Sequence, residues 1–315
     1  MAILLALSGI VGCSYTDMVS VHSNGNPAGQ GGSSYPGLSQ NGRYVVFASF
    51  ADNLVDGDTN SNTDVFVHDT LEHTTTRVSV NSSGDQTVDP FPFSNGGSNG
   101  PEISADGRFI SFISLANNLV SDDTGLFRDV FVHDRDTGET IRASVDSDGN
   151  QIDSDSRWPA ISGNGENVAF HNFANLIMED PGYFGIYRRN IASGALAPVS
   201  VNTAGDTANA LSRYPRLSHD GMQIVFESTA DNLGSDDNNG KQDIFVRDIA
   251  AGTTTRVSVD TDGNETNDSS FDGDISPDGR YVVFATAATN LGYPDNNGGG
   301  RLLISRPVGR PNHPR

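Results

Sequence analysis

The sequence has few of the residues that fold or anchor many other proteins. It holds one cysteine in 315 residues, so no disulfide can form within the chain and cysteine pairing says nothing about the redox compartment. Lysine and arginine number 19 against 40 aspartate and glutamate residues, which gives a net charge of −21. Nucleic acid or an anionic membrane surface is therefore a disfavoured partner, since phosphate binding needs clustered positive charge. The charge suits cation binding, or solubility alone.

A long hydrophobic run is also missing. The most apolar stretch, AILLALSGIVG at residues 2–12, is too short to span a bilayer. It is followed at once by Cys13 and resembles a bacterial lipoprotein signal with a loose lipobox at residues 10–13. That resemblance implies an exported protein, periplasmic, on the cell surface or extracellular, with a lipid anchor at Cys13. The alternatives are a truncated signal peptide or an apolar N-terminal strand.

What the sequence does contain is a repeat. A phenylalanine that closes an apolar strand recurs with spacings of 65, 58, 56 and 58 residues, at Phe47, Phe112, Phe170, Phe226 and Phe284. A fixed period of this length, carrying only strand signals, is typical of a β-propeller or a solenoid. The 35 glycines and the abundant Asn, Asp, Ser and Thr fit short strands joined by many turns.

The ends of the repeat favour a closed ring over an open stack. The last repeat stops at residues 302–305 without its RVSV strand, and the chain begins with an unpaired MVSV at residues 18–21. We therefore predict an all-β fold, a five-bladed β-propeller of four-stranded blades in which the N-terminal strand completes the last blade. The propeller is expected to span residues 18–306, between a signal-like segment at 1–17 and a basic tail at 307–315.

Each repeat follows one pattern. A short strand such as YPGLS leads into a tight Asn-Gly or Asp-Gly turn, then into YVVFAS, DVFVHD and TTRVSV strands. The combination of S-x-D-G-R, D-V-F-V-x-D and G-T-T-T-R-V-S-V resembles TolB-type propellers with WD-like repeats, found in many exported bacterial proteins. The resemblance covers nearly the whole chain and implies the fold more firmly than the function, because propellers host binding, scaffolding and enzymatic roles.

The loop between the second and third strands of the first repeat is the sharpest candidate for metal chemistry. Its sequence, DGDTNSNTD, places an oxygen donor at every second position, as a hard cation such as calcium requires. The predicted calcium ligands are Asp56, Asp58, Asn60, Asn62 and Asp64. The fourth repeat keeps a partial version of the pattern in Asp237, Asn239 and Asp243. The alternative is that these side chains cap the turn without metal.

The first strand of each repeat should line the centre of the ring. Positions two apart share a strand face, and the apolar residue that follows them belongs to the core. The residues expected at the mouth of the central channel are Tyr35, Glu102, Trp158, Tyr214, Arg216, Asp272 and Asp274. Aromatic rings with convergent polar groups are typical of a sugar or peptide site. Alternatively, the rings wedge between blades and the charges are solvated.

Binding is the function that these features favour over catalysis. We expect a binding or scaffold propeller that recognises a protein or glycan on the face bearing the long acidic loops, with calcium stabilising at least one loop. One alternative is a glycoside hydrolase in which Glu102 or Asp272 acts with Asp274 as paired carboxylates. A second alternative is a structural subunit of a surface assembly joined through blade edges. No nucleophilic triad is evident in the sequence.

Overall fold

The computed structural model describes residues 16–88, 97–124, 127–173, 185–234, 237–291 and 301–305. These residues form nineteen β-strands and no helix, which confirms the all-β prediction. Accordingly, no helix in this part of the chain is long and apolar enough to cross a membrane. The signal-like residues up to 15, with Cys13, and the basic tail lie outside the described residues.

The strands form five antiparallel sheets in sequence order, here called blades 1 to 5. Blade 1 contains β1 (Ser33–Leu38), β2 (Tyr44–Ser49), β3 (Asp64–Asp69) and β4 (Thr74–Arg77). Blade 2 contains β5 (Asn99–Ile103), β6 (Phe109–Ser114), β7 (Asp129–Asp134) and β8 (Thr140–Arg142). Blade 3 contains β9 (Ser156–Ile161), β10 (Asn167–Asn172), β11 (Gly185–Asn190) and β12 (Leu196–Pro198). Blade 4 contains β13 (Ser212–Leu217), β14 (Gln223–Ser228), β15 (Asp243–Asp248) and β16 (Thr253–Arg256), and blade 5 contains β17 (Ser270–Ile275), β18 (Val282–Thr286) and β19 (Arg301–Ser305).

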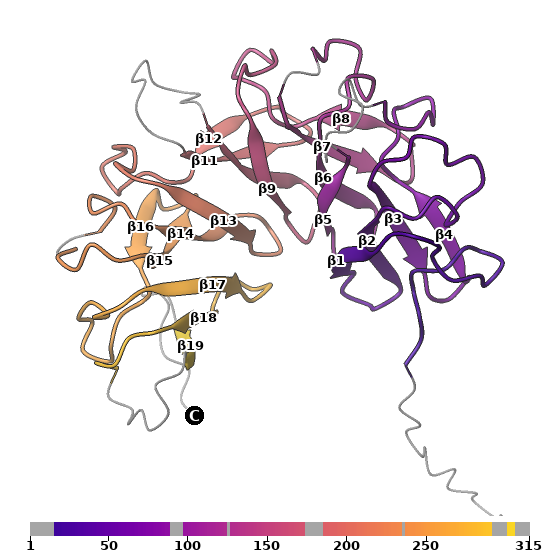
Figure 1. Cartoon of the computed structure of the whole chain (residues 1–315). Coiled ribbons are helices and arrows are strands. Elements are labelled where there is room, and N and C mark those ends of the chain that lie inside the picture. The colour runs from indigo at the N-terminus through magenta and orange to yellow at the C-terminus, as the bar shows by residue number, and fades with distance from the viewer. Residues whose placement is uncertain are drawn as a thin grey trace, which may run out of the picture.

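The blades are arranged around a common centre, with the first strand of each blade innermost (Figure 1). Strands β1, β5, β9, β13 and β17 contact one another in that order. This arrangement is that of a five-bladed β-propeller, as the period predicts.

The core lies between successive blades. The second and third strands carry apolar side chains on both faces of the sheet, so each face can pack on a neighbouring sheet. Between blades 1 and 2, Val46, Val65 and Val67 pack against Ile110 and Phe112. Equivalent clusters fill the next three interfaces. The repeated phenylalanine of the sequence is fully or almost fully buried in every blade.

The recurring S-x-[DN]-G turn holds each blade to the one before it. In blade 1, Ser39 Oγ donates to Asn41 Oδ1 and accepts from the backbone N–H of Tyr44. The next turn glycine, Gly107, has a φ of +81°, and a Cβ there would lie 2.1 Å from the ring of Tyr44. Glycine is therefore required at Gly107 both by its backbone conformation and by close packing between blades.

The N-terminal segment occupies the place of an inter-blade connection. Thr75 Oγ1 donates to the carbonyl of Val21, and Thr140 Oγ1 of blade 2 donates to the carbonyl of Val80 in the same way. Residues 18–21 are thus related to blade 1 as residues 77–80 are related to blade 2, which fits their predicted place at the end of blade 5. Among the described residues blade 5 has three strands, so closure through this segment stays a prediction.

Apolar side chains remain exposed at the two ends of the series of blades. Leu38 of β1 is 61% exposed, whereas its counterpart in β5, Ile103, packs on the core between blades 1 and 2. In blade 5, Leu302 and Ile304 are 85% and 66% exposed. Their counterparts in blade 1, Val65 and Val67, are buried against blade 2. Each end therefore presents the apolar face that elsewhere packs on a neighbouring blade.

Candidate functional site

The predicted calcium loop of blade 1 folds back on its own sheet and gathers three of its five predicted ligands. Asp58, Asn60 and Asp64 come together, and Asn60 Nδ2 donates to Asp64 Oδ2 over 2.9 Å. Asp56 is fully exposed and pairs with His22 Nε2 at 3.6 Å. Asn62 contributes its backbone N–H, which donates to Asn60 Oδ1. These contacts do not bring the side-chain oxygen atoms of Asp56 and Asn62 to those of Asp58, Asn60 and Asp64.

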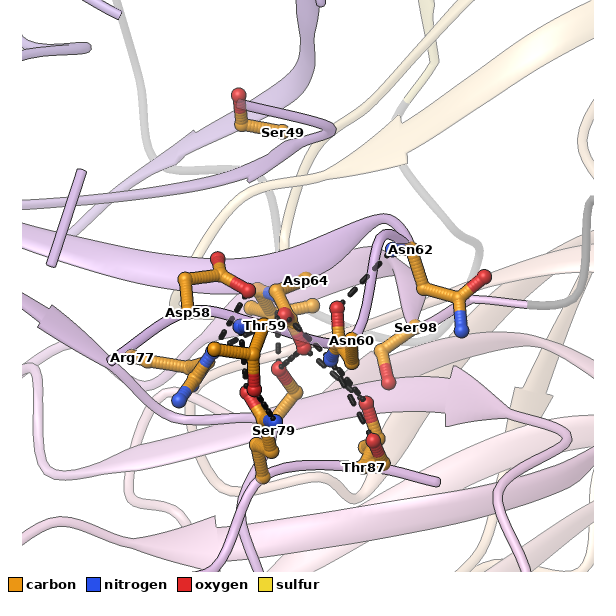
Figure 2. Close-up of polar contacts among 12 residues, drawn as sticks. Ser49, Asp58, Thr59, Asn60, Asn62, Asp64, Arg77, Ser79, Thr87 and Ser98 are labelled. Carbon is orange, nitrogen blue, oxygen red and sulfur yellow. Dashed lines mark hydrogen bonds and ion pairs between the residues drawn. The ribbon is translucent and has the colours of Figure 1, made fainter. Parts of the chain in front are cut away.

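A guanidinium group lies where these carboxylates meet (Figure 2). Arg77 Nη1, from the outer strand β4, is 3.1 Å from Asp58 Oδ1 and 3.4 Å from Asp64 Oδ2. Ser79 Oγ donates to Asp64 Oδ1 over 2.6 Å. Burial and the neighbouring Asp64 raise the pKa of Asp58, and Arg77 opposes this shift. The chain's own cation thus neutralises part of the charge predicted to attract calcium.

The same network recurs in blades 2 and 4. In blade 2, Arg142 faces Asp122, Asp123 and Asp129, and burial raises the pKa of Asp129 to about 7. In blade 4, Arg256 faces Asp237 and Asp243. Blade 3 has Gly185 and Pro198 at the positions of Asp64 and Arg77, and blade 5 has Arg301 at the position of Asp64.

The loops of this network lie at one end of each blade. The loop from β2 to β3 meets the connection that leads to the next blade. In blade 1, the Thr59 N–H donates to Gln86 Oε1, and Gln86 Nε2 donates to Thr59 Oγ1. Asp64 Oδ1 also accepts from Thr87 Oγ1 in that connection. The acidic residues therefore tie three segments of the chain together.

Every innermost strand carries a β-bulge at the same place, where its pairing register shifts. One residue of each bulge has a positive φ between 51° and 58°: Tyr35, Gly100, Trp158, Tyr214 and Asp272. Four of these are not glycine, and a left-handed backbone is costly for large side chains. In four of the five strands a proline follows, and it is tolerated because the bulge has already interrupted the ladder. The bulge sets the direction of the side chains predicted to line the centre.

Two of the three predicted aromatic rings lie together. The ring centroids of Trp158 in blade 3 and Tyr214 in blade 4 are 4.7 Å apart. The ring of His171, which is fully buried, lies 5.0 Å from Trp158, and burial lowers the pKa of His171 to about 4. Tyr214 is 38% exposed and Tyr35 is 61% exposed. Among the described residues, no ring contact joins Tyr35 to the other two.

The predicted charged residues also converge, from blades that are not neighbours. Glu102 Oε1 of blade 2 is 3.6 Å from Arg216 Nη1 of blade 4. Burial raises the pKa of Glu102, Arg216 lowers it, and Asp274 of blade 5 raises it. Asp272 is placed by its backbone, because its N–H donates to Glu227 Oε1 over 2.7 Å. Glu102, Arg216 and Asp274 therefore lie close to one another, although they belong to three different blades.

Sequence reasoning overlooked the arginine of each carboxylate network and the buried Glu227, and it assigned the histidine peculiar to blade 3, His171, no functional role. A signal for the arginine was present. The third-strand aspartate and the fourth-strand arginine occur together in blades 1, 2 and 4 and are both missing from blade 3. Residues that appear and disappear together across repeats commonly contact one another. His171 and Glu227 occupy equivalent positions, directly after the repeated phenylalanine, where the other blades carry alanine or isoleucine.

No protein-family model and no curated protein sequence matches the chain. Several solved structures do match it. A TolB-type protein from Agrobacterium tumefaciens is 14% identical over 89% of this chain and 78% of its own, with a TM-score of 0.50. An oligogalacturonate lyase from Vibrio parahaemolyticus is 13% identical over 86% of this chain and 61% of its own, also at 0.50. TolB from Acinetobacter baumannii is 17% identical, and this chain spans 57% of its length, with a TM-score of 0.46.

Structural similarity at this low sequence identity supports the fold alone. The matches extend over most of the five blades rather than over a single repeat. They agree with the sheet topology, with the innermost strands and with the sequence pattern of the repeats. The chain therefore has a TolB-like β-propeller fold.

Proposed function

We propose that this chain is an exported, non-catalytic binding propeller whose recognition surface is the centre of the ring. The observation that carries this proposal is the pair of rings formed by Trp158 and Tyr214, 4.7 Å apart on neighbouring blades. Tyr214 is partly exposed, and the separate ring of Tyr35 is more exposed still. Exposed aromatic faces supply contact area for a sugar or a peptide at low entropic cost.

The backbone at these positions does not itself demand an aromatic residue. Gly100 in blade 2 adopts the same bulge with a φ of +58°, without a side chain. Placing Trp158 or Tyr214 in a left-handed conformation costs free energy that glycine would avoid. Retaining the rings at a strained position is typical of a functional surface.

Charged groups next to the rings would give such a surface its specificity. Arg216 is 41% exposed at its side chain and pairs with Glu102 at 3.6 Å, so it can exchange this partner for a carboxylate or hydroxyl of a ligand. The ligand class that fits is a protein segment or a glycan. The net charge of −21 disfavours nucleic acid.

Trp158 provides the experiment, because it is the only tryptophan of the chain. Its intrinsic fluorescence would be titrated with panels of neutral oligosaccharides, acidic oligosaccharides and peptides. A saturable change with one class, lost in Tyr214→Ala and kept in Tyr281→Ala, would support the proposal. Tyr281 is a suitable control because it lies beside the S-x-D-G turn of blade 5, away from the bulge. No saturable change with any panel would count against it.

A glycoside hydrolase is the second candidate, and one observation favours it. Burial and the nearby Asp274 raise the pKa of Glu102, as expected for a general acid beside a carboxylate. Arg216 opposes this shift, since its charge favours the ionised form of Glu102. A hydrolase predicts glycan cleavage that is abolished by Glu102→Gln and by Asp274→Asn. Binding without turnover in the wild type would favour the first proposal.

Calcium at the loop of blade 1 and the lipid anchor remain predictions. For calcium, Arg77 competes with any ion bound by Asp58 and Asp64.

For the anchor, Cys13 would incorporate labelled palmitate when the full chain is expressed in a bacterial host that processes lipoproteins. The label should be lost in Cys13→Ser. Absence of label in the wild-type protein would show that Cys13 carries no lipid anchor.

A further inference from the structure

Blade 4 has a carboxylate, Glu265, at a position where blades 1 and 2 have an amide. Oxygen atoms of Asp237, Asp243 and Glu265 all lie within 4.8 Å of one another. Their side chains are 2%, 0% and 16% exposed. Arg256 Nη1 contacts all three, at 3.9 Å from Asp237, 3.3 Å from Asp243 and 2.7 Å from Glu265. One positive charge therefore faces three acidic groups.

The third carboxylate replaces an amide. The residue that pairs back on the end of the fourth-strand segment is Gln86 in blade 1, Gln151 in blade 2 and Glu265 in blade 4. Gln151 Nε2 donates to Asp129 Oδ2 over 3.0 Å and to Asp123 Oδ1 over 3.5 Å. A glutamate at this position supplies no such donor when it is ionised. At this position blade 4 thus has a negative charge and no donor, whereas blade 2 has a neutral amide that donates; the further carboxylate on Arg142 in blade 2, Asp122, is largely exposed.

The missing donor leaves a buried oxygen unsatisfied. Asp237 Oδ1 is buried and has no hydrogen-bond partner among the described residues. Asp237 is the counterpart of Asp123, the residue that the amide of Gln151 reaches in blade 2. Leaving a buried carboxylate oxygen without a donor or a cation is strongly unfavourable. This atom requires a positive charge or a proton.

We propose that Asp237, Asp243 and Glu265 form a binding site for a hard divalent cation of the calcium class. Carboxylate oxygens are the ligands that such a cation prefers, and a divalent ion together with Arg256 balances the three negative charges. The ion would lie on the side of Asp237 Oδ1, the oxygen that Arg256 does not contact. It would join the loop before β15 to the connection that carries Glu265. The site is separate from the ring centre and does not depend on the function proposed there.

The test uses the full chain stripped with EDTA and titrated with calcium, followed by calorimetry and by thermal unfolding. The wild type should bind one calcium ion and show a saturable rise of several degrees in melting temperature. Glu265→Gln restores the residue type that blades 1 and 2 carry at this position, so it should fold normally and lose the bound ion. Asp237→Asn should lower the affinity about tenfold or more, because it removes ligand charge.

Blade 1 offers the converse control. Gln86→Glu places a third carboxylate beside Asp58 and Asp64 and should create a second site, raising the stoichiometry from one ion to two. A stoichiometry that stays at one would contradict the role assigned to the third carboxylate. Unchanged binding in Glu265→Gln would exclude the site in blade 4. The proposal would also fail if the wild type bound no calcium and Glu265→Gln were more stable than the wild type by the same amount with and without calcium. That result would mean that a proton shared between Asp237 and Glu265, and not a metal ion, holds these two carboxyl groups together.

Discussion

Glu102 and Arg216 form an ion pair across the centre of the ring, with Oε1 and Nη1 3.6 Å apart, although they belong to blades 2 and 4. The innermost strands bring residues together that lie 114 positions apart in the sequence. Both side chains are more than a third exposed, so the pair should contribute little to stability. We expect this pair, which lies near the carboxylate of Asp274, to matter more for the proposed recognition than for folding.

A double-mutant cycle tests the strength of this pair. Glu102→Gln and Arg216→Gln should show a coupling free energy of about 0.2–1 kcal/mol in denaturant unfolding, decreasing as salt is added. The raised pKa of Glu102 means that the folded state holds this proton more tightly than the unfolded state does. Stability from this group is therefore fully present below its unfolded pKa and is lost as pH rises through its folded pKa. Glu102→Gln should accordingly stabilise the protein more at pH 7 than at pH 4, and an equal effect at both pH values would contradict the shift.

Two turn glycines allow the effect of backbone conformation on stability to be measured separately from the effect of packing. Gly107 and Gly42 both have positive φ values, of 81° and 73°. A Cβ at Gly107 would meet the ring of Tyr44 at 2.1 Å, whereas a Cβ at Gly42 has no atom within 4 Å. Both alanine substitutions should destabilise the protein, and Gly107→Ala should cost about 1–3 kcal/mol more because it also overpacks an interface between blades. Equal losses in urea unfolding would show that the interface relaxes around the added methyl group.

Asp134 should make stability depend on pH at the acid end. Arg108 Nε and Nη2 donate to its two oxygens over 2.8 and 2.6 Å, and this pairing lowers the pKa of Asp134 to about 2. The folded pKa is depressed, so the stabilisation is present above the unfolded pKa near 4 and is lost as pH falls toward 2. Asp134→Asn should be less stable than the wild type at pH 7, by about 1–3 kcal/mol, and the difference should shrink toward pH 2. Asparagine is tolerated at the equivalent position of blade 3, Asn190, so the variant should fold.

A cross-link tests whether the ring closes. If blade 5 packs on blade 1 as blade 1 packs on blade 2, Leu38 will lie against Ile304, as Ile103 lies in the cluster with Val67. Leu38→Cys with Ile304→Cys, in a Cys13→Ser background, should then form an intramolecular disulfide under mild oxidation. Electrophoresis without reductant would show a faster monomer. Cross-linked dimers alone would indicate that these exposed apolar faces join two copies, as in a surface assembly.

Local chemistry is what the sequence determined. The spacing of Phe47, Phe112 and their counterparts predicts five blades, because each blade is a continuous segment whose strands and turns are specified within about sixty residues. The S-x-[DN]-G turn is equally local, since Ser39, Asn41 and the N–H of Tyr44 bond to one another within six residues. The faces of the innermost strands were also predictable, because side chains two apart share a face.

Only the tertiary structure decided what the acidic side chains meet. The alternating oxygens of residues 56–64 predict a cation, but the pattern does not say that Arg77, from another strand, supplies one. In the same way, Glu265 joins Asp237 and Asp243 from a connection more than twenty residues away, and the sequence alone showed no reason to group Glu265 with these two aspartates. Glu102 meets Arg216 only because the ring curves back on itself. Charges act through space, so the residues that neutralise a carboxylate depend on the folded arrangement of segments rather than on their order in the chain.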